Sequence, residues 1–246
     1  MNRTSLICGC IVWGICSVCP AQEAETSENE ESPWSGNVSL TGEYRYGNTV
    51  SRSSTVTGEA LFSRDKNEFA SKIRSYFASD NTGITARNTS LSVKYDRLFT
   101  ERFSWYLSEE LYNDRFLDLE LRSTAGTGAA FRIWKDKKKK LTVELGAAYI
   151  TEDHIVYENA EETTGRAAVQ IELKAGGNIV FRDSLEVFPS FEESGEYTMK
   201  NECIMLTGLG AGWAMKLNHL LQHDTNPPAG INKTDVTLSL GLQYSF

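Results

Sequence analysis

TDVTLSLGLQYSF (residues 234–246) is the stretch of sequence that decides the fold. From Val236 to Phe246 every even position is apolar or aromatic, and every odd position is polar or glycine. A strict period of two places the apolar side chains on one face of an extended β-strand. A single strand cannot satisfy its own backbone N–H and C=O groups, so this terminal strand needs neighbours on both sides. We therefore expect it to close a β-barrel.

The same alternation recurs from Trp34 onward, and we count about twelve strands before the chain ends. Connections after even-numbered strands are short, as in RDKN (64–67), KDKKKK (135–140) and AGGN (175–178). Most of those after odd-numbered strands are longer, as in DNTGITAR (80–87), TEDHIVYENAEETTG (151–165) and DTNPPAGINK (224–233), although GNT (47–49) is short. Outer-membrane barrels have short periplasmic turns and longer outside loops. The sequence therefore predicts an antiparallel up-and-down β-barrel over residues 34–246.

Three features favour a transmembrane barrel over a soluble one. Strands of ten or more residues are long enough to span a bilayer when tilted. Charged residues alternate with the apolar ones, and they are too numerous for a dry core because a buried unpaired charge is costly. Aromatic residues gather at strand ends, where membrane interfaces favour them. The expected periplasmic girdle is Trp34, Phe62, Phe69, Phe103, Trp105, Phe131, Trp213, Tyr244 and Phe246, and the expected outer girdle is Tyr44, Tyr46, Phe77 and Tyr149.

The first residues have the composition of an export signal. Arg3 precedes a short apolar run, and small residues before position 22 predict a signal peptide over residues 1–21. Gly9-Cys10 offers an alternative lipoprotein cleavage site, but few apolar residues precede it. Residues 22–33 are acidic and lack an apolar period, which predicts a flexible tail. Four of the five cysteines would leave with the signal, so Cys203 has no partner for a disulfide.

Composition excludes two other classes of protein. No apolar run after the first residues is long enough for a transmembrane helix, and the mean hydropathy is −0.36. The formal net charge is −8, and it becomes −9 without Arg3. An acidic chain argues against a nucleic-acid partner, and the basic run 135–140 between two alternating strands indicates a solvated hairpin.

The segments GEYRYGNT (42–49), NPPAGINKTD (226–235) and SLGLQYSF (239–246) resemble the family of salt-induced outer-membrane proteins, catalogued as a domain of unknown function. The resemblance covers nearly all of the mature chain and implies a location in the bacterial outer membrane. Terminal Tyr244 and Phe246 are similar to the signal that the barrel-assembly machinery recognises. The resemblance implies outer-membrane lipid and that machinery as partners, and it transfers no catalytic residues.

Charges on the polar face are the candidate functional residues. They indicate either a network that fills a narrow barrel or the selectivity lining of a pore for small solutes or ions. The candidate lumen-lining residues are Glu43, Arg45, Lys72, Arg74, Lys94, Glu110, Arg122, Glu144 and Arg182.

The three histidines offer little for catalysis or metal binding. His219 and His223 are four strand residues apart, about 13 Å, which is too far to share a metal. His223 at the outer rim, or His154 beside Glu152 and Asp153, would carry the alternative of a rim-located lipid or peptide hydrolase. We expect no cofactor, no metal and a non-enzymatic envelope barrel, with a small-solute pore as the first alternative.

Overall fold

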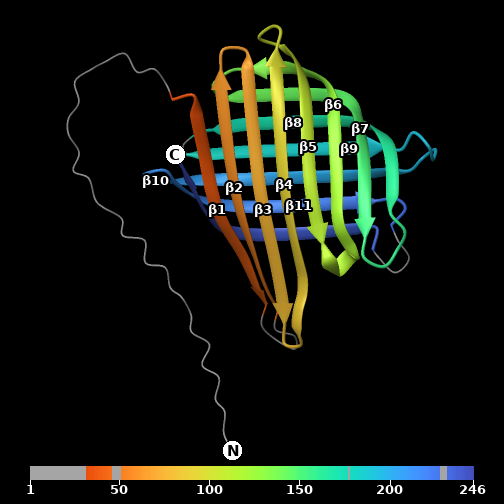
Figure 1. Cartoon of the computed structure of the whole chain (residues 1–246). Helices are drawn as coiled ribbons and strands as arrows, with labels where there is room; N and C mark the ends of the chain where they lie inside the picture. The colour runs from red at the N-terminus through yellow and green to blue at the C-terminus, as the bar shows by residue number, and fades with distance from the viewer. Residues whose placement is uncertain (1–31, 46–50, 177, 228–231) are drawn as a thin grey trace, which may run out of the picture. The chain divides into compact units, whose positions relative to one another are not determined.

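The chain forms a closed barrel of twelve antiparallel strands in the computed structural model, which describes residues 32–45, 51–176, 178–227 and 232–246 (Figure 1). The strands are β1 (Trp34–Arg45), β2 (Ser51–Arg64), β3 (Asn67–Asp80), β4 (Gly83–Leu98), β5 (Phe103–Asp114), β6 (Leu119–Lys135), β7 (Lys139–His154), β8 (Ala160–Ala175), β9 (Ile179–Pro189), β10 (Tyr197–Gly210), β11 (Trp213–Asp224) and β12 (Thr234–Ser245). A short 3₁₀ helix, η1 (Arg115–Leu117), joins β5 to β6. No helix in the described part of the chain is long and apolar enough to cross a membrane.

Each strand pairs with its neighbours in sequence, and β12 pairs with β1 to close the ring. Leu40 lies opposite Leu242 and Val38 opposite Tyr244 in this seam. Beyond the last ladder pair, Gly36 and Phe246 exchange two backbone hydrogen bonds of 3.0 Å. The predicted all-β, up-and-down architecture and the closing role of residues 234–246 are therefore confirmed.

The barrel is apolar outside and polar inside. Leu40, Ile73 and Leu240 project outward from three strands and are 59%, 53% and 53% exposed. Glu144, Lys216 and Gln243 project inward and are buried. The period-two alternation produces this distribution because successive side chains point to opposite faces of the wall. A protein surrounded by water rarely exposes so much contiguous apolar surface.

The two ends of the barrel differ. The chain termini of the barrel lie at the turn end, together with the short connections 65–66, 99–102, 136–138, 176–178 and 211–212. The loop end carries the other connections, of which 190–196 and 225–233 are the longest. Aromatic rings pair at the turn end, with centroids 4.8 Å apart for Trp34 and Phe62 and 5.1 Å apart for Trp213 and Tyr244. Of the predicted outer girdle, Tyr46 and the Tyr44 side chain lie outside the described residues, as do residues 1–31 with the predicted signal peptide and most of the tail.

Several predicted loops are strand instead. The expected acidic loop 151–165 is wrong, because β7 continues to His154 and Glu152 pairs with Ala160 of β8. The expected connections 80–87 and 135–140 shrink in the same way, to 81–82 and 136–138. Polar residues on both faces end the hydropathy alternation there, but the backbone ladder continues as long as neighbouring N–H and C=O groups can pair.

One predicted side-chain direction is also wrong. Strict alternation along the strand predicts the outer face for both Leu119 and Leu121, but Leu119 is buried and Leu121 is exposed. The register of β6 shifts between these two residues. A bulge adds one residue to a strand, which turns the side chains on its two sides to opposite faces.

The seam predicts a strong effect of one added methyl group. A Cβ at Gly241 would lie 1.9 Å from the Leu40 carbonyl oxygen, a backbone atom that the seam pairing holds in place. We expect Gly241→Ala to destabilise the barrel by about 3 kcal/mol, as overpacking does, measured by urea unfolding in detergent micelles. A Cβ at Gly176 meets nothing within 4 Å, so Gly176→Ala is the matched control. Equal stability of the two variants would contradict a tight seam.

Candidate functional site

A polar chamber of about 1050 Å³ occupies the loop-end half of the barrel interior. Four of the predicted lumen residues border it: Lys72, Arg74, Glu110 and Arg122. A second hollow of about 230 Å³ lies deeper, bordered by Lys94 and Arg166, and shares Lys72 and Glu110 with the chamber. The inward-facing positions of the strands thus surround a space large enough for a small solute.

Most chamber cations are paired with carboxylates from other strands. Lys72 of β3 lies 2.5 Å from Glu202 of β10, and Lys200 of β10 lies 3.1 Å from Glu110 of β5. These pairs join strands that are not neighbours in the wall, so they cross the interior. Pairing offsets the cost of holding these charges away from bulk water.

A second group of polar contacts surrounds Arg74. Its Nη1 donates to Asn88 Oδ1 at 3.2 Å, and Asn88 donates to Asp114 Oδ2 at 3.3 Å. The Tyr112 hydroxyl also donates to Asp114 Oδ2, at 3.0 Å. The other oxygen of Asp114 accepts the Phe116 N–H at 3.0 Å and caps η1. Asp114 therefore fixes the connection after β5 to the chamber wall.

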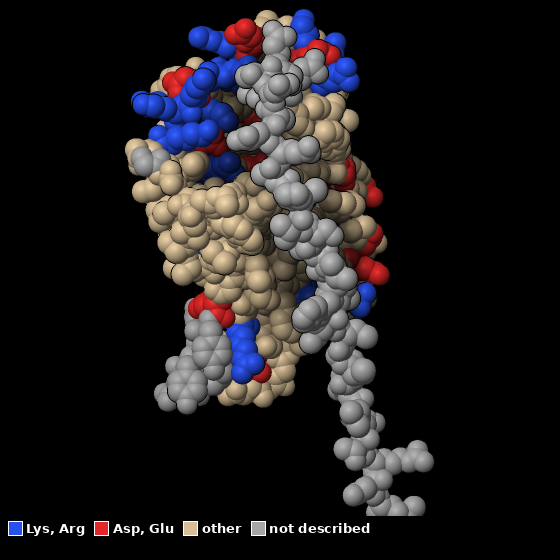
Figure 2. Space-filling view, turned by 90° about the vertical axis from the view of Figure 1, so that its left-hand side faces the viewer, with Lys and Arg blue, Asp and Glu red and all other residues tan. Residues whose placement is uncertain are grey.

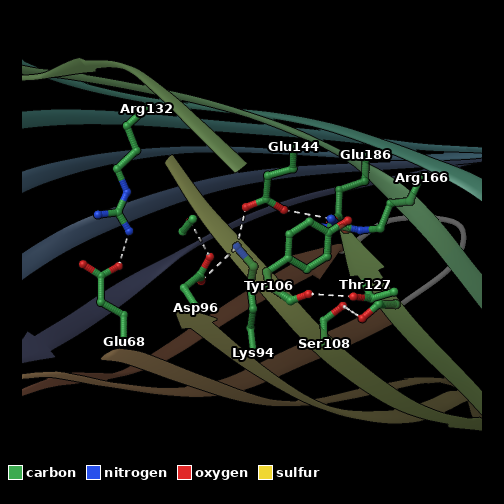
Figure 3. Close-up of polar contacts among 12 residues, drawn as sticks. Glu68, Lys94, Asp96, Tyr106, Ser108, Thr127, Arg132, Glu144, Arg166 and Glu186 are labelled. Carbon is green, nitrogen blue, oxygen red and sulfur yellow. Dashed lines mark hydrogen bonds and ion pairs between the residues drawn. The ribbon is translucent and has the colours of Figure 1, made fainter. Parts of the chain in front are cut away.

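Below the chamber, five side chains form a compact group that we call the plug: Lys94, Tyr106, Glu144, Arg166 and Glu186 (Figure 3). Glu144 contacts Lys94 through one oxygen and lies 2.8 Å from Arg166 Nη1 through the other. Arg166 also contacts Glu186. The Tyr106 ring lies between the two cations, with Lys94 and Arg166 each 5.0 Å from its centroid. Tyr106 and Glu144 are completely buried.

Two glycines make room for the plug. A Cβ at Gly146 would lie 2.5 Å from the Tyr106 hydroxyl oxygen, and one at Gly128 would lie 2.8 Å from it. A Cβ at either position would also lie less than 3 Å from backbone atoms of the neighbouring strand. Glycine in a strand often marks such a close approach. The wall of β6 and β7 therefore accepts the tip of the tyrosine ring.

Other buried side chains fill the interior around the plug. Lys216 donates to Ser39 Oγ at 3.1 Å, and Lys94 lies 3.1 Å from Asp96. Buried residues from strands all around the wall complete this layer: Ser39, Thr57, Asp96, Ser104, Ala130, Ala148, Ala168, Ile204, Leu206, Lys216 and Gln243. Among the described residues, the chamber is thus bordered by loop-end residues such as Glu196 and Asn226, and buried side chains fill the interior on the side of the turn end.

The predicted lumen residues divide into separate groups. Lys94 and Glu144 belong to the plug, and Arg182 lies 2.9 Å from Glu172 outside both groups. Glu43 is half-buried on the face of β1 that carries Ser39 and Thr41. The Arg45 side chain lies outside the described residues.

Sequence reasoning missed several residues of the interior: Tyr106, Arg166, Glu186, Lys200, Glu202 and Lys216. Arg166 and Tyr106 stood on the polar faces of their strands, and the strand glycines 128 and 146 were an available signal of close packing. The sequence pattern leaves the strand registers over residues 179–212 undetermined, which hid Lys200 and Glu202.

Two of the histidines, His154 and His223, have polar neighbours in the part of the chain that the structure describes. His154 Nε2 lies 3.1 Å from Glu152 Oε2, and His223 Nδ1 lies 2.7 Å from Thr234 Oγ1. Thr234 is a partner that the sequence pattern did not indicate. In the described part of the chain, no three His, Cys, Asp or Glu side chains gather as metal ligands would.

The plug predicts a large cost for neutralising its central carboxylate. Glu144→Gln would leave Lys94 and Arg166 buried beside each other with less compensating charge. We expect a loss of about 3 kcal/mol in the free energy of unfolding, measured by urea titration in micelles. Glu172→Gln is the control, because its partners Lys140 and Arg182 are well exposed. A Glu144→Gln barrel as stable as this control would argue against a coupled plug.

Comparisons with known proteins agree with the barrel. Among solved structures, the NanC porin is 6% identical, covers 85% of this chain and 98% of its own, and has a TM-score of 0.55. The autotransporter NalP translocator domain from Neisseria meningitidis is 15% identical, with 89% and 90% coverage and a TM-score of 0.48. The KdgM porin in complex with disordered oligogalacturonate is 13% identical, with 86% and 99% coverage and a TM-score of 0.47. At such low identity, the likeness to NanC shows the fold alone.

A search of curated proteins found no match. The family described as "Protein of unknown function, DUF481" matches residues 38–246, from within β1 to the end of β12. Induction by salt, which the sequence resemblance implied, stays a prediction. With this match over most of its length, the chain belongs to the DUF481 family of proteins of unknown function.

Proposed function

We propose that this protein is an integral barrel of the bacterial outer membrane, non-enzymatic, with an interior that is closed at rest. The observation that carries the proposal is the apolar outer face, since large exposed side chains such as Leu40 and Leu240 project away from a wall whose inner face holds buried charges. Exposing this apolar face to water would cost free energy. A lipid environment removes that cost, because transferring apolar surface out of water is favourable.

The dimensions of the strands support membrane insertion. The shortest, β9, has 11 residues, and β5 has 12. At about 3.3 Å per residue and a tilt near 40°, twelve residues rise about 30 Å, close to the hydrocarbon thickness of a bilayer. Closure adds a second argument, because only a closed sheet satisfies its backbone in lipid.

The proposed partners follow from that location. Outer-membrane lipid would contact the apolar face, and the predicted signal over residues 1–21 would direct export. Tyr244 and Phe246, at the seam with β1, are the residues we propose the barrel-assembly machinery recognises. Their position suits that role, since the last strand must pair with the first to complete the barrel.

A small-solute pore is the second candidate function. The chamber of about 1050 Å³ favours it, because a scaffold needs no hollow of that size. Passage would require the plug to rearrange, since Tyr106 and Glu144 are completely buried in the layer beneath the chamber.

Single-channel recording in a planar bilayer tests the closed interior. We expect the refolded mature protein to give no steady current steps, because the plug fills the interior. Tyr106→Ala removes the ring between Lys94 and Arg166, and we expect it to produce steady steps. Tyr106→Phe keeps the ring and should stay silent. Steady steps in the unaltered protein, with a size that Arg122→Glu changes, would favour the pore instead.

A lipase assay tests the non-enzymatic part of the proposal. His223 and Thr234 form a hydrogen-bonded pair at the loop end, which brings a base and a hydroxyl group together. We expect fatty-acid release from phospholipid micelles to be the same for the unaltered protein and for His223→Ala. Turnover that His223→Ala abolishes, with the fold intact, would make the protein a rim hydrolase.

A further inference from the structure

We propose that one side of the turn end binds the headgroups of anionic phospholipids in the adjoining leaflet. The inference rests on the proposed membrane location and adds a lipid preference to it. The surface, here called the basic collar, consists of Arg64, Lys66, Arg97, Arg102, Lys135, Lys137, Lys138, Lys139, Lys140 and Lys174. All ten side chains are exposed. Figure 2 shows Lys and Arg side chains gathered at this end of the barrel.

Backbone hydrogen bonds hold the turns of the collar side by side. The Leu98 N–H donates to the Lys66 carbonyl, the Arg132 N–H to the Arg102 carbonyl, and the Lys174 N–H to the Lys138 carbonyl, each at 2.8 Å. These bonds continue the ladder beyond the strands. They join the β2–β3 turn to β4, the β4–β5 turn to β6, and the β6–β7 turn to β8. The cations therefore form one continuous arc.

The positive charge of the arc is mostly not neutralised by the protein. Among the described residues, one collar cation has a carboxylate partner: Lys140, which lies 3.1 Å from Glu172. The Asp136 carboxylate accepts the backbone N–H groups of Lys138 and Lys139 at 2.8 and 2.6 Å. These backbone hydrogen bonds, together with the nearby charges of Lys139 and Lys138, hold the pKa of Asp136 below its usual value. Asp65, Glu101 and Asp136 lie in the same turns, so the collar carries an excess of positive charge over these carboxylates that an anionic ligand would balance.

The depth of the collar suits phosphate groups of lipid. Phe99 lies beside Arg102 in one turn, and Ile133 and Trp134 directly precede Lys135 in β6. These apolar side chains are about half exposed and lie at the edge of the outward apolar band. Aromatic rings favour the boundary between hydrocarbon and headgroups. The lysines that follow Trp134 then reach the headgroup layer, where each cation near an anionic surface is worth about fivefold in affinity.

The collar covers one side of the barrel only. The remaining connections at this end, 176–178 and 211–212, contain no charged residue in the sequence. The loop end has the opposite character, with Asp118, Asp153, Glu158, Glu192 and Glu193 among its connections and strand ends. Anionic lipid is therefore expected beside β2 to β8 at the turn end.

Lipid selectivity in a bilayer tests the proposal. The mature chain is refolded into phosphatidylcholine bilayers that contain spin-labelled phosphatidylglycerol or spin-labelled phosphatidylcholine, and the motionally restricted fraction of each label is measured. We expect a severalfold preference for phosphatidylglycerol at low salt, which 0.5 M salt removes. Lys137→Gln/Lys138→Gln should abolish most of the preference, because each of the two removed cations is worth about fivefold in affinity.

The matched control removes two exposed cations from the loop end. Arg87→Gln/Arg115→Gln should keep the preference of the unaltered protein, and heat-modified gel mobility verifies that each variant is folded. Equal restriction of both labels by the unaltered protein would overturn the inference, as would equal losses in the two double variants. If neither label is restricted, the protein does not contact lipid, which overturns the proposed function together with the collar.

Discussion

The closed backbone ladder is the constraint on which the rest of the structure depends. Every strand has a partner on each side, and the last pairing joins β12 to β1. In lipid, an open edge would leave a row of unsatisfied N–H and C=O groups, each costing several kcal/mol. Gly36 and Gly241 admit the close contacts of the seam with Phe246 and Leu40. Closure thus requires small residues at particular points of an otherwise regular wall.

Once the wall is closed, alternation sends half of its side chains inward, and they must satisfy one another. Glu144 bonds to cations from β4 and β8, while Lys72 of β3 reaches Glu202 of β10 across the interior. A tyrosine ring between two cations fills the centre. The interior is therefore a polar core held by paired charges, and the chamber is the part of it that remains open to water.

The chamber, the plug and the basic collar lie at different levels of the barrel, and each has a separate proposed role. The chamber lining includes the loop-end residues Glu196 and Asn226, so the proposed solute route begins at that end. The plug decides whether it passes further. The proposed partner of the collar is a different one, because the collar cations are exposed in the turns and do not line the chamber. These roles are separable, since no collar residue belongs to the plug.

The sequence by itself determined the barrel, its twelve strands, its apolar outer face and the terminal strand that closes it. Alternation is a local property of each strand, so it could be identified without knowing any neighbour. Only the tertiary structure decided which charges pair, because partners such as Lys72 and Glu202 come together through the register of strands far apart in sequence. It also decided that residues 151–165 are mostly strand and that Leu119 points inward, because ladder pairing and a bulge leave no trace in hydropathy. The plug depends on Tyr106 meeting Gly128 and Gly146, a contact that exists only when three strands lie side by side.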